Sequence, residues 1–515
     1  MMARLFECEG VTEMELCVRT VRLLGVLVLL GAAFLVSACD NGVGTTETAG
    51  DAEAVDVADR DAGGSADDDD DDDVGQDDAG AETDAGIPDA DAGGADAGPC
   101  TWTPHPSNPI IEAHWTTPGD LLINDPCVLR ESNHYRMWYS LGPGLGINHV
   151  KIYDGTSPDG IQWTLNPTVL ISPNSDVTVS GISTPVVSGV YGLNGEMDTD
   201  FVNGNPAYTR EGGGWFLWFD SGQGNYRLSD ALGGDGSASW LGTGGTIVDG
   251  TFSPHTGAAT GTLSITSAWD SKITETPNVI LVDEIYHLYY SGAKVGDGPG
   301  RYQTGHATSP DGVTWTKDPA NPVLMYLEDP LQWGFYTVGE PGVVYNNRTA
   351  LFQLYYTTVR YRGPDYEGTD FAAQGGIALA TSTNGSNFIL QGAVLTQSAS
   401  YPVEDLVMGY STPFSMIDST GLFHLFYDVA FYPTPGAWKQ LALAHAVSTD
   451  GYAFTEIEAD IFTAGSGWLE EEVRAPAVVE ENGIFKMWFA GNNSLFFQPG
   501  FVWGLGYAVS NRVCR

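Results

Sequence analysis

The chain has 515 residues, 42% of them hydrophobic, and is therefore long enough to bury a large core. Its many Gly, Pro, Trp and Tyr residues and its low charged fraction of 17% favour β-structure over an all-helical fold. The formal net charge is −45, but the densest acidic run lies between Asp40 and Asp96, and no cluster of Lys and Arg could track phosphates. We therefore expect no nucleic-acid partner.

The first 39 residues have the pattern of an export signal. Arg19 and Arg22 precede an apolar run, Leu23 to Val36, that is too short for an ordinary membrane span. The sequence Val-Ser-Ala-Cys then resembles a bacterial lipobox, with Cys39 as the lipidated residue. An ordinary signal peptide is the alternative. We expect an exported protein, periplasmic or at the cell surface, that touches the membrane through this lipid only.

Residues 40–99 are rich in Asp, Ala and Gly and include seven consecutive aspartates, Asp67 to Asp73. Such a segment cannot bury a core, and its like charges repel, so it predicts a disordered, extended linker. Specific calcium binding is the alternative, but the twelve-residue loop with a terminal Glu is missing.

An internal repeat occupies residues 100–515. In each copy a proline opens an apolar strand, and an aromatic-rich strand follows with its central aromatic 12 to 14 residues after the proline. The six prolines are Pro126, Pro206, Pro277, Pro341, Pro413 and Pro476. The six central aromatic residues are Trp138, Trp218, Tyr289, Tyr355, Phe426 and Trp488.

A third strand follows in most copies and ends in an Asp-Gly or Asn-Gly turn, where Gly accepts positive φ without strain. The four clear turns are Ser157 to Trp163, Ser309 to Trp315, Ser382 to Phe388 and Ser448 to Phe454. A fourth strand begins after the turn. Four antiparallel strands in each repeat predict an all-β fold, a β-propeller.

The last copy stops after its third strand, whereas residues Trp102 to Ile111 match the pattern of a fourth strand. We therefore expect the N-terminal strand to complete the last blade and close the ring. Cys100 and Cys514 flank this junction where other blades have their turn, which predicts a disulfide in an exported protein. Cys127 lies in an apolar strand and is expected to be buried.

Six repeats predict six blades. The second copy is the weakest, with a degenerate turn and insertions on both sides, Ser172 to Gly204 and Thr251 to Thr274. If this copy is not a true blade, the ring has five.

The innermost strands of a propeller line its axis, and proline is tolerated at the start of a strand and favours an extended preceding residue. The pairs before the prolines should therefore face one site, and three of the six carry a carboxylate: Asn124-Asp125, Glu275-Thr276 and Gly339-Glu340. The others are Gly204-Asn205, Ser411-Thr412 and Arg474-Ala475. Facing carboxylates are what glycoside hydrolysis uses. Strand capping, or water binding in a polar channel, is the alternative.

These repeats resemble the propeller clan of glycoside hydrolases that includes the family 43 arabinanases and xylosidases, the family 32 invertases and the levansucrases. Asn124-Asp125-Pro126 is similar to the invertase N-D-P triplet, and Glu275-Thr276-Pro277 to the family 43 E-G-P acid motif. The resemblance implies that Asp125 is the base or nucleophile and Glu275 the general acid, with Glu340 as a rival acid.

The sequence departs from this clan in two ways. Six copies are present where the clan is usually five-bladed, and Asn205 stands where the second blade should carry an Asp, for which Asp198 or Asp200 could substitute. Sialidases are a second comparison, because they are six-bladed, but they need three arginines and Arg474 is the only one at a pre-proline position.

Aromatic and histidine residues divide into structural and binding candidates. Trp138 and Trp488 fit the core between blades, whereas Trp333 and Tyr336, shortly before Glu340, could stack on a sugar ring. His306 and His445 recur at one third-strand position, which indicates structure. No H-E-x-x-H or paired C-x-x-C spacing occurs, so no metal or cofactor is expected.

The sequence as a whole favours a surface-tethered, monomeric propeller that binds plant or microbial glycans. We expect hydrolysis by Asp125 with Glu275 or Glu340, and substrate contacts from Asn124, Asn205, Trp333, Tyr336 and Arg474. A non-catalytic propeller that binds carbohydrate or protein is the alternative.

Overall fold

The computed structural model describes residues 100–113, 122–142, 150–194, 201–298, 300–361, 373–396, 407–434, 437–494 and 502–515. Cys39, the linker 40–99, Asp198 and Asp200 lie outside these residues, so the predictions made for them are untested. In the described residues, every regular element is a strand, and no helix is long and apolar enough to cross a membrane.

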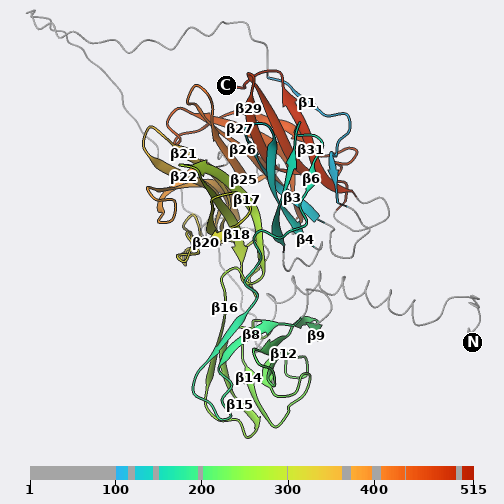
Figure 1. Cartoon of the computed structure of the whole chain (residues 1–515), viewed down its shortest axis with the longest axis vertical. Coiled ribbons are helices and arrows are strands. Elements are labelled where there is room, and N and C mark those ends of the chain that lie inside the picture. The colour runs from blue at the N-terminus through green and yellow to red at the C-terminus, as the bar shows by residue number, and fades with distance from the viewer. Residues whose placement is uncertain are drawn as a thin grey trace, which may run out of the picture. The chain divides into compact units, whose positions relative to one another are not determined.

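Five antiparallel sheets of the propeller type form the blades (Figure 1). Blade 1 comprises β3 (Leu122–Arg130), β4 (Tyr135–Gly142), β5 (Lys151–Ser157) and β6 (Thr164–Leu165). Blade 2 comprises β17 (Ile273–Val282), β18 (Ile285–Ala293), β19 (Gln303–Ser309) and β20 (Thr316–Lys317). Blade 3 comprises β21 (Val338–Asn346), β22 (Leu351–Tyr361), β23 (Ala373–Ser382) and β24 (Ile389–Thr396).

Blade 4 comprises β25 (Val407–Ile417), β26 (Phe423–Thr434), β27 (Ala437–Ser448) and β28 (Thr455–Thr463). Blade 5 comprises β29 (Glu472–Glu481), β30 (Ile484–Asn492), β31 (Trp503–Ser510) and the N-terminal β1 (Trp102–Pro104). The innermost strands contact one another in the order β3, β17, β21, β25 and β29, and β29 returns to β3. The ring is therefore closed, as the repeat predicts.

The N-terminal strand closes the ring as expected. Trp102 of β1 pairs with Ser510 of β31, and the short β2 (Ile111–Glu112) pairs farther along the same strand. Cys100 and Cys514 form a disulfide across this junction, with their Cα atoms 5.6 Å apart. Both predictions are confirmed, and Cys127 is buried as expected.

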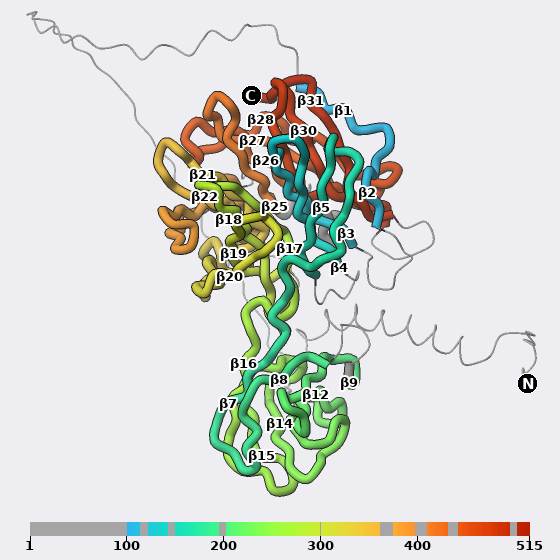
Figure 2. The backbone as a smooth tube through the Cα atoms, in the orientation of Figure 1, coloured from blue at the N-terminus to red at the C-terminus, as the bar shows by residue number. Residues whose placement is uncertain are grey.

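The second repeat copy is not a blade, so the count of six is wrong and the alternative of five is correct. Its strands belong to a separate closed barrel, which is inserted in the sequence between blades 1 and 2 and is traced in green in Figure 2. The barrel strands are β7 (Val177–Ser180), β8 (Gly189–Leu193), β11 (Tyr208–Arg210), β12 (Phe216–Asp220), β13 (Asn225–Ser229), β14 (Ala238–Gly242), β15 (Gly250–Gly257) and β16 (Leu263–Ser267).

The two insertions explain this outcome. They supply β7 and β8 before the copy and β15 and β16 after it, and β7 pairs with β16. The pairing of β7 with β16 joins the two edge strands of this sheet, so the sheet closes into a barrel and has no open edge of the kind that a blade retains. Its buried side chains, including Tyr208, Leu217 and Trp240, form a core of their own.

Hydrogen bonds between blades connect the two most regular features of the repeat, the central aromatic and the turn glycine. Each donor lies on the second strand of one blade, and each acceptor is the glycine carbonyl of the turn in the next blade. The bonds are Trp138 to Gly312 at 3.1 Å, Tyr289 to Gly385 at 2.7 Å, Tyr355 to Gly451 at 2.8 Å and Trp488 to Gly160 at 2.7 Å. These aromatics are thus part of the core between blades, as predicted for Trp138 and Trp488.

The turns themselves are held in one geometry that suits this role. In the first, Ser157 Oγ accepts from the Gly160 N–H at 2.8 Å, and Asp159 Oδ1 accepts from Ile161 and Gln162 at 2.8 Å. Gly160 has φ 81°, and a Cβ there would come within 2.8 Å of Trp488. Glycine is therefore required by both the backbone and the contact.

The junction between blades 4 and 5 departs from the pattern in both partners. The central aromatic of blade 4 is Phe426, which has no donor, and blade 5 has the disulfide instead of a turn. Phe426 packs edge-on against Trp102, with ring centroids 6.2 Å apart. Here a covalent bond and an aromatic contact replace the hydrogen bond used at the other four junctions.

Opening the disulfide should destabilise the propeller strongly. Its sequence separation is 414 residues, and loop-closure entropy gives about 6 kcal/mol for a loop of that length. We expect Cys100→Ser/Cys514→Ser to lower the free energy of unfolding by a large part of that amount, measured by guanidinium denaturation. Under reducing conditions the wild type should match the variant, and an unchanged midpoint on reduction would contradict the closure account.

Removing one hydroxyl should test the bonds between blades. Tyr355→Phe keeps the ring but leaves the Gly451 carbonyl without its donor, so we expect a loss of about 1–3 kcal/mol in unfolding free energy. Tyr208→Phe is the matched control, because among the described residues the buried Tyr208 hydroxyl has no partner. Equal effects from the two substitutions would refute the proposed role of the bond.

Candidate active site

The residue before each blade proline is in the left-handed region, and not extended as the general rule for proline suggests. The φ angles are 50° at Asp125, 51° at Thr276, 51° at Glu340, 47° at Thr412 and 53° at Ala475. In all five inner strands the pairing register shifts at this residue and its proline. The expectation of an extended residue is wrong because the proline, which has no N–H, sits in a β-bulge where the strand bends.

This conformation costs of order 1–3 kcal/mol per residue and persists only where neighbouring groups hold it. At four junctions the N–H of the left-handed residue donates to a side chain on the second strand of the preceding blade. The acceptors are Ser140 for Thr276 at 2.9 Å, Ser291 for Glu340 at 2.7 Å, Thr357 for Thr412 at 2.8 Å and Asp428 for Ala475 at 2.8 Å. At the fifth junction the corresponding residue is Ala490, whose methyl side chain cannot accept a hydrogen bond.

The bulges bring the predicted acids together in one buried cluster. Asp125 is 4% exposed, Glu275 and Glu340 are each 9% exposed, and Arg474 is partly exposed. Glu275 interacts electrostatically with Asp125, Arg474 and Glu340. Asp125 interacts in the same way with Arg474 and Glu340. The three acids and the arginine therefore share one site, although they come from blades 1, 2, 3 and 5.

Burial shifts the protonation of this cluster towards neutral pH. It raises the pKa of Asp125 to about 6, with Arg474 opposing the shift. It raises the pKa of Glu275 from 4.5 to about 7, with the negative charge of Asp125 adding to the shift. Burial would disfavour the charge of Arg474, but the surrounding carboxylates, Asp125 first, raise its pKa above the usual value. Such shifts are typical of acid and base catalysts.

Two members of the cluster were not predicted. Asp428 of β26 is fully buried, and burial raises its pKa well above the usual range. Asp428 occupies the same second-strand position as Ser140, Ser291 and Thr357 in the other blades. A carboxylate in place of a hydroxyl at this repeat position could have identified Asp428 from the sequence. Tyr302 hydrogen-bonds Glu275, and burial raises its pKa well above normal. It precedes β19, and no repeat feature marks it.

Several buried polar atoms of the cluster have no partner among the described residues. They are Asn124 Oδ1, Asp125 Oδ1, Asp428 Oδ2 and Arg474 Nε. An unpaired buried polar atom costs about 1–3 kcal/mol, so such a group indicates a place for water or ligand. A cavity of about 20 Å³, bounded by Asp125, Thr276, Glu340, Thr412 and Ala475, lies on the ring of prolines and has room for about one water molecule.

The remaining predicted binding residues are placed differently from one another. Asn124 is buried next to Asp125 and pairs across the sheet with Ser140. Asn205 lies in β10 (Asn205–Pro206), which pairs with β9 (Phe201–Val202). The comparison of Asn205 with a second-blade acid is therefore wrong, because blade 2 begins with Glu275-Thr276.

Trp333 and Tyr336 lie in the segment before β21. The Arg360 guanidinium covers Trp333, 4.4 Å from the ring centroid, and the Tyr336 N–H donates to the Val359 carbonyl at 3.2 Å. Arg360 thus occupies one face of the proposed sugar platform. Stacking of a sugar on Trp333 or Tyr336 stays a prediction.

Four histidines form two relays, in which His306, His424 and His445 are buried, and this agrees with the structural role predicted for His306 and His445. His287 Nδ1 lies 3.0 Å from His306 Nε2, and His306 Nδ1 lies 2.9 Å from Asp318. In blade 4, His424 Nδ1 lies 2.9 Å from His445 Nε2. Burial, with the partner histidine, lowers the pKa of His287 and of His424 to about 4, so both are neutral at pH 7.

A second cavity, of about 1140 Å³, lies at the C-terminal ends of the inner strands. Its lining includes Arg130, Glu131, Arg348 and Glu480, together with Asn278 and Phe414, which also border the small axial cavity. Asp125, Glu275 and Glu340 do not line it. This cavity is therefore distinct from the acid cluster, although it shares Asn278 and Phe414 with the axial cavity.

Neutralising Glu275 should stabilise the protein in a pH-dependent way. Because its folded pKa is about 7 and the unfolded value is near 4.5, the native state loses stability as pH rises through this interval. We expect Glu275→Gln to gain roughly 1–3 kcal/mol at pH 8 relative to its effect at pH 4.5, measured by denaturant titration. The exposed control Glu470→Gln should show no such difference. The same effect of Glu275→Gln at both pH values would contradict the shift.

Comparison with known proteins gives a likeness of fold only. The sequence matches no protein-family model and no curated protein. A structure of a putative glycoside hydrolase from Parabacteroides distasonis is 11% identical, with a TM-score of 0.44, covering 81% of this chain and 98% of its own.

Two other solved structures are similar to this chain. One comes from work on family 130 mannoside phosphorylases and glycoside hydrolases that target β-1,2-mannosidic linkages in Candida mannan; it is 12% identical, with a TM-score of 0.45, covering 81% of this chain and 95% of its own. A thermostable family 43 glycoside hydrolase is 11% identical, with a TM-score of 0.41, covering 76% of this chain and 89% of its own. At these identities and TM-scores each likeness is one of fold alone.

Proposed function

We propose that the propeller is a glycoside hydrolase whose acid and base are drawn from the axial cluster. The observation that carries this proposal is the convergence of Asp125, Glu275 and Glu340, from three blades, on one buried site. Glycoside hydrolysis needs one carboxyl that holds a proton and one that has lost it. Burial with mutual repulsion supplies this difference near neutral pH.

Asp125 is the proposed base or nucleophile and Glu275 the proposed acid. Burial raises the pKa of both carboxyls and the charge of Asp125 adds to the shift of Glu275, so the pair holds one proton near neutral pH; Arg474 lowers the pKa of Asp125 more than that of Glu275, which favours Asp125 as the ionised partner. Arg474 stabilises the ionised partner. Glu340 is the rival acid, and its Oε2 accepts from the Thr412 N–H at 3.4 Å.

The proposed substrate is a plant or microbial polysaccharide or oligosaccharide, reached outside the cytoplasm by a chain tethered through Cys39. The signal-like residues 1–39 and the acidic linker support this location. The buried, unpaired oxygens of Asn124 and Asp125 would accept hydrogen bonds from sugar hydroxyls.

Hydrolysis should depend on the cluster, and substitutions in it should show whether Glu275 or Glu340 is the general acid. In a screen of arabinan, xylan, fructan and mannan, we expect Asp125→Asn to lower the rate by about 10²–10⁴-fold. Loss of the true acid, by Glu275→Gln or Glu340→Gln, should abolish polysaccharide hydrolysis but spare aryl glycosides, whose leaving groups need no proton. Activity should fall below about pH 6 and above about pH 7.

The exposed Glu470→Gln is the control and should keep full activity. Hydrolysis that survives Asp125→Asn would contradict the mechanism. Absence of hydrolysis on every substrate, with a folded protein, would contradict the enzymatic function.

The second candidate is a non-catalytic glycan- or protein-binding propeller, favoured by the cavity of about 1140 Å³. This volume suits a ligand, whereas the axial cavity of about 20 Å³ has room for about one water molecule. Calorimetry separates the two candidates: binding that is lost in Arg348→Ala and unchanged in Asp125→Asn would assign the ligand to the large cavity.

A further inference from the structure

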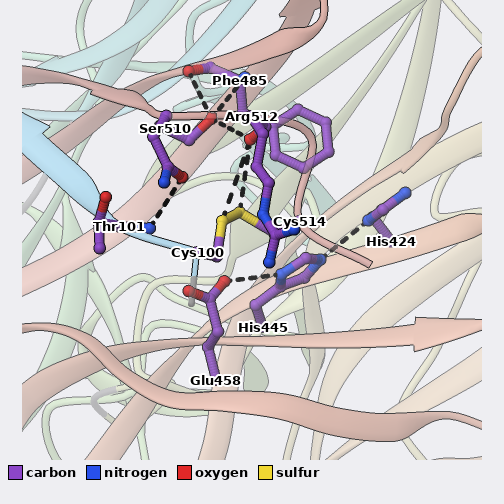
Figure 3. Close-up of a disulfide and its surroundings, with 10 residues drawn as sticks. Cys100, Thr101, His424, His445, Glu458, Phe485, Ser510, Arg512 and Cys514 are labelled. Carbon is purple, nitrogen blue, oxygen red and sulfur yellow. Dashed lines mark hydrogen bonds and ion pairs between the residues drawn. A yellow bond between two sulfur atoms is a disulfide. The ribbon is translucent and has the colours of Figure 1, made fainter. Parts of the chain in front are cut away.

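The disulfide that closes the ring has a carboxylate beside it. The sulfur atoms of Cys100 and Cys514 and a carboxylate oxygen of Glu458 all lie within 4.8 Å of one another (Figure 3). The three residues come from separate parts of the fold: Cys100 precedes β1, Cys514 follows β31, and Glu458 belongs to β28 of blade 4. Nothing in the ring closure itself requires a carboxylate at this position.

A chain of contacts through the buried His445 and His424 positions the Glu458 carboxylate. His445 Nδ1 lies 3.1 Å from Glu458 Oε2, and His445 in turn contacts His424 (Figure 3). His424 Nε2 lies 3.4 Å from Asp418, whose Oδ2 accepts from Arg515 Nε at 2.9 Å. Because Arg515 follows Cys514 directly, this chain of contacts returns to the disulfide.

Blade 2 contains a matched relay that ends differently. There His306 contacts Asp318, and Asp318 hydrogen-bonds Ser386 in the turn of blade 3. At the junction of blades 4 and 5 the turn is replaced by the two cysteines, so the corresponding acid, Glu458, faces sulfur. The same local architecture therefore presents two thiols and a carboxylate once the disulfide is opened.

We propose that the reduced form of this junction binds a zinc-type divalent ion through Cys100, Cys514 and Glu458. A dithiol reductant transfers two electrons and two protons to the disulfide and is itself oxidised to a disulfide. The ion then displaces the two thiol protons and accepts both thiolates and the carboxylate as ligands. Water completes a tetrahedral set, and the charge of the two thiolates, one carboxylate and the ion sums to −1.

The geometry is compatible with such a site. Zinc–sulfur bonds of about 2.3 Å place two tetrahedral sulfur ligands about 3.8 Å apart. The Cα–Cα distance of 5.6 Å allows this after the sulfurs separate by side-chain rotation. Zinc takes Cys and carboxylate ligands, and ligating carboxylates are usually hydrogen-bonded, which His445 provides for Glu458. The ion would keep both chain ends joined and tie them to blade 4 while the disulfide is open.

Cobalt titration of the reduced full chain, in detergent and without oxygen, tests the proposal. Cys8, Cys17 and Cys39 are replaced by serine in every sample, so that only the junction cysteines and the buried Cys127 remain. We expect one cobalt ion per chain, with thiolate charge-transfer bands and tetrahedral d–d bands that zinc displaces. The oxidised protein and Cys100→Ser/Cys514→Ser should show neither set of bands.

Two further variants isolate the role of the carboxylate. Glu458→Gln should weaken binding by about tenfold or more, because it removes a ligand, whereas Asp318→Asn, the matched residue of blade 2, should leave the affinity unchanged. Zinc should also restore part of the thermal midpoint lost on reduction. The proposal is overturned if the reduced protein binds no stoichiometric cobalt, or if Glu458→Gln binds it as tightly as the wild type.

Discussion

The hydrogen bond from the left-handed pre-proline residue of one blade to the second strand of the preceding blade is the constraint on which the site depends. At four of the five junctions this bond stabilises the left-handed backbone conformation, which costs free energy for residues other than glycine. Because the residue lies in a bulge, the inner strand bends where it reaches the axis. Proline sets the place of the bulge, and the neighbouring blade makes it stable.

This arrangement explains why the acidic side chains are buried together and why the pKa values of Asp125 and Glu275 are raised. Asn124 and Asp125 come from the bulge of blade 1, whereas Glu275, Glu340 and Arg474 come from the corresponding bulges of blades 2, 3 and 5. Asp428 has two roles, since its Oδ1 accepts a hydrogen bond from the Ala475 N–H and its carboxyl group belongs to the buried cluster. Such a site has a cost in stability, because a buried ionised carboxyl is unfavourable and the charge of Arg474 offsets only part of that cost.

The spacing of prolines, aromatics and turns was sufficient to predict the blades, the closing strand and the disulfide. It could not show that the second copy is a barrel, because Pro206 and Trp218 keep the blade spacing and only the pairing of β7 with β16 distinguishes the two folds. Without that copy, Glu275 belongs to blade 2 and Glu340 to blade 3. The left-handed residues were missed because a residue before proline generally prefers the extended conformation, and the hydrogen bond that overrides this preference comes from another blade. Asp428 was readable from the repeat, whereas Tyr302 depends on packing alone.

The central claim is that burial around the axis keeps carboxyls protonated near neutral pH, and infrared difference spectroscopy during a pH titration tests it most directly. The account predicts a band from a buried, protonated carboxyl that persists above pH 5, titrates between about 6 and 7, and is diminished in Asp125→Asn and Glu275→Gln. Complete ionisation of every carboxyl by pH 5, as expected for exposed side chains, would contradict it.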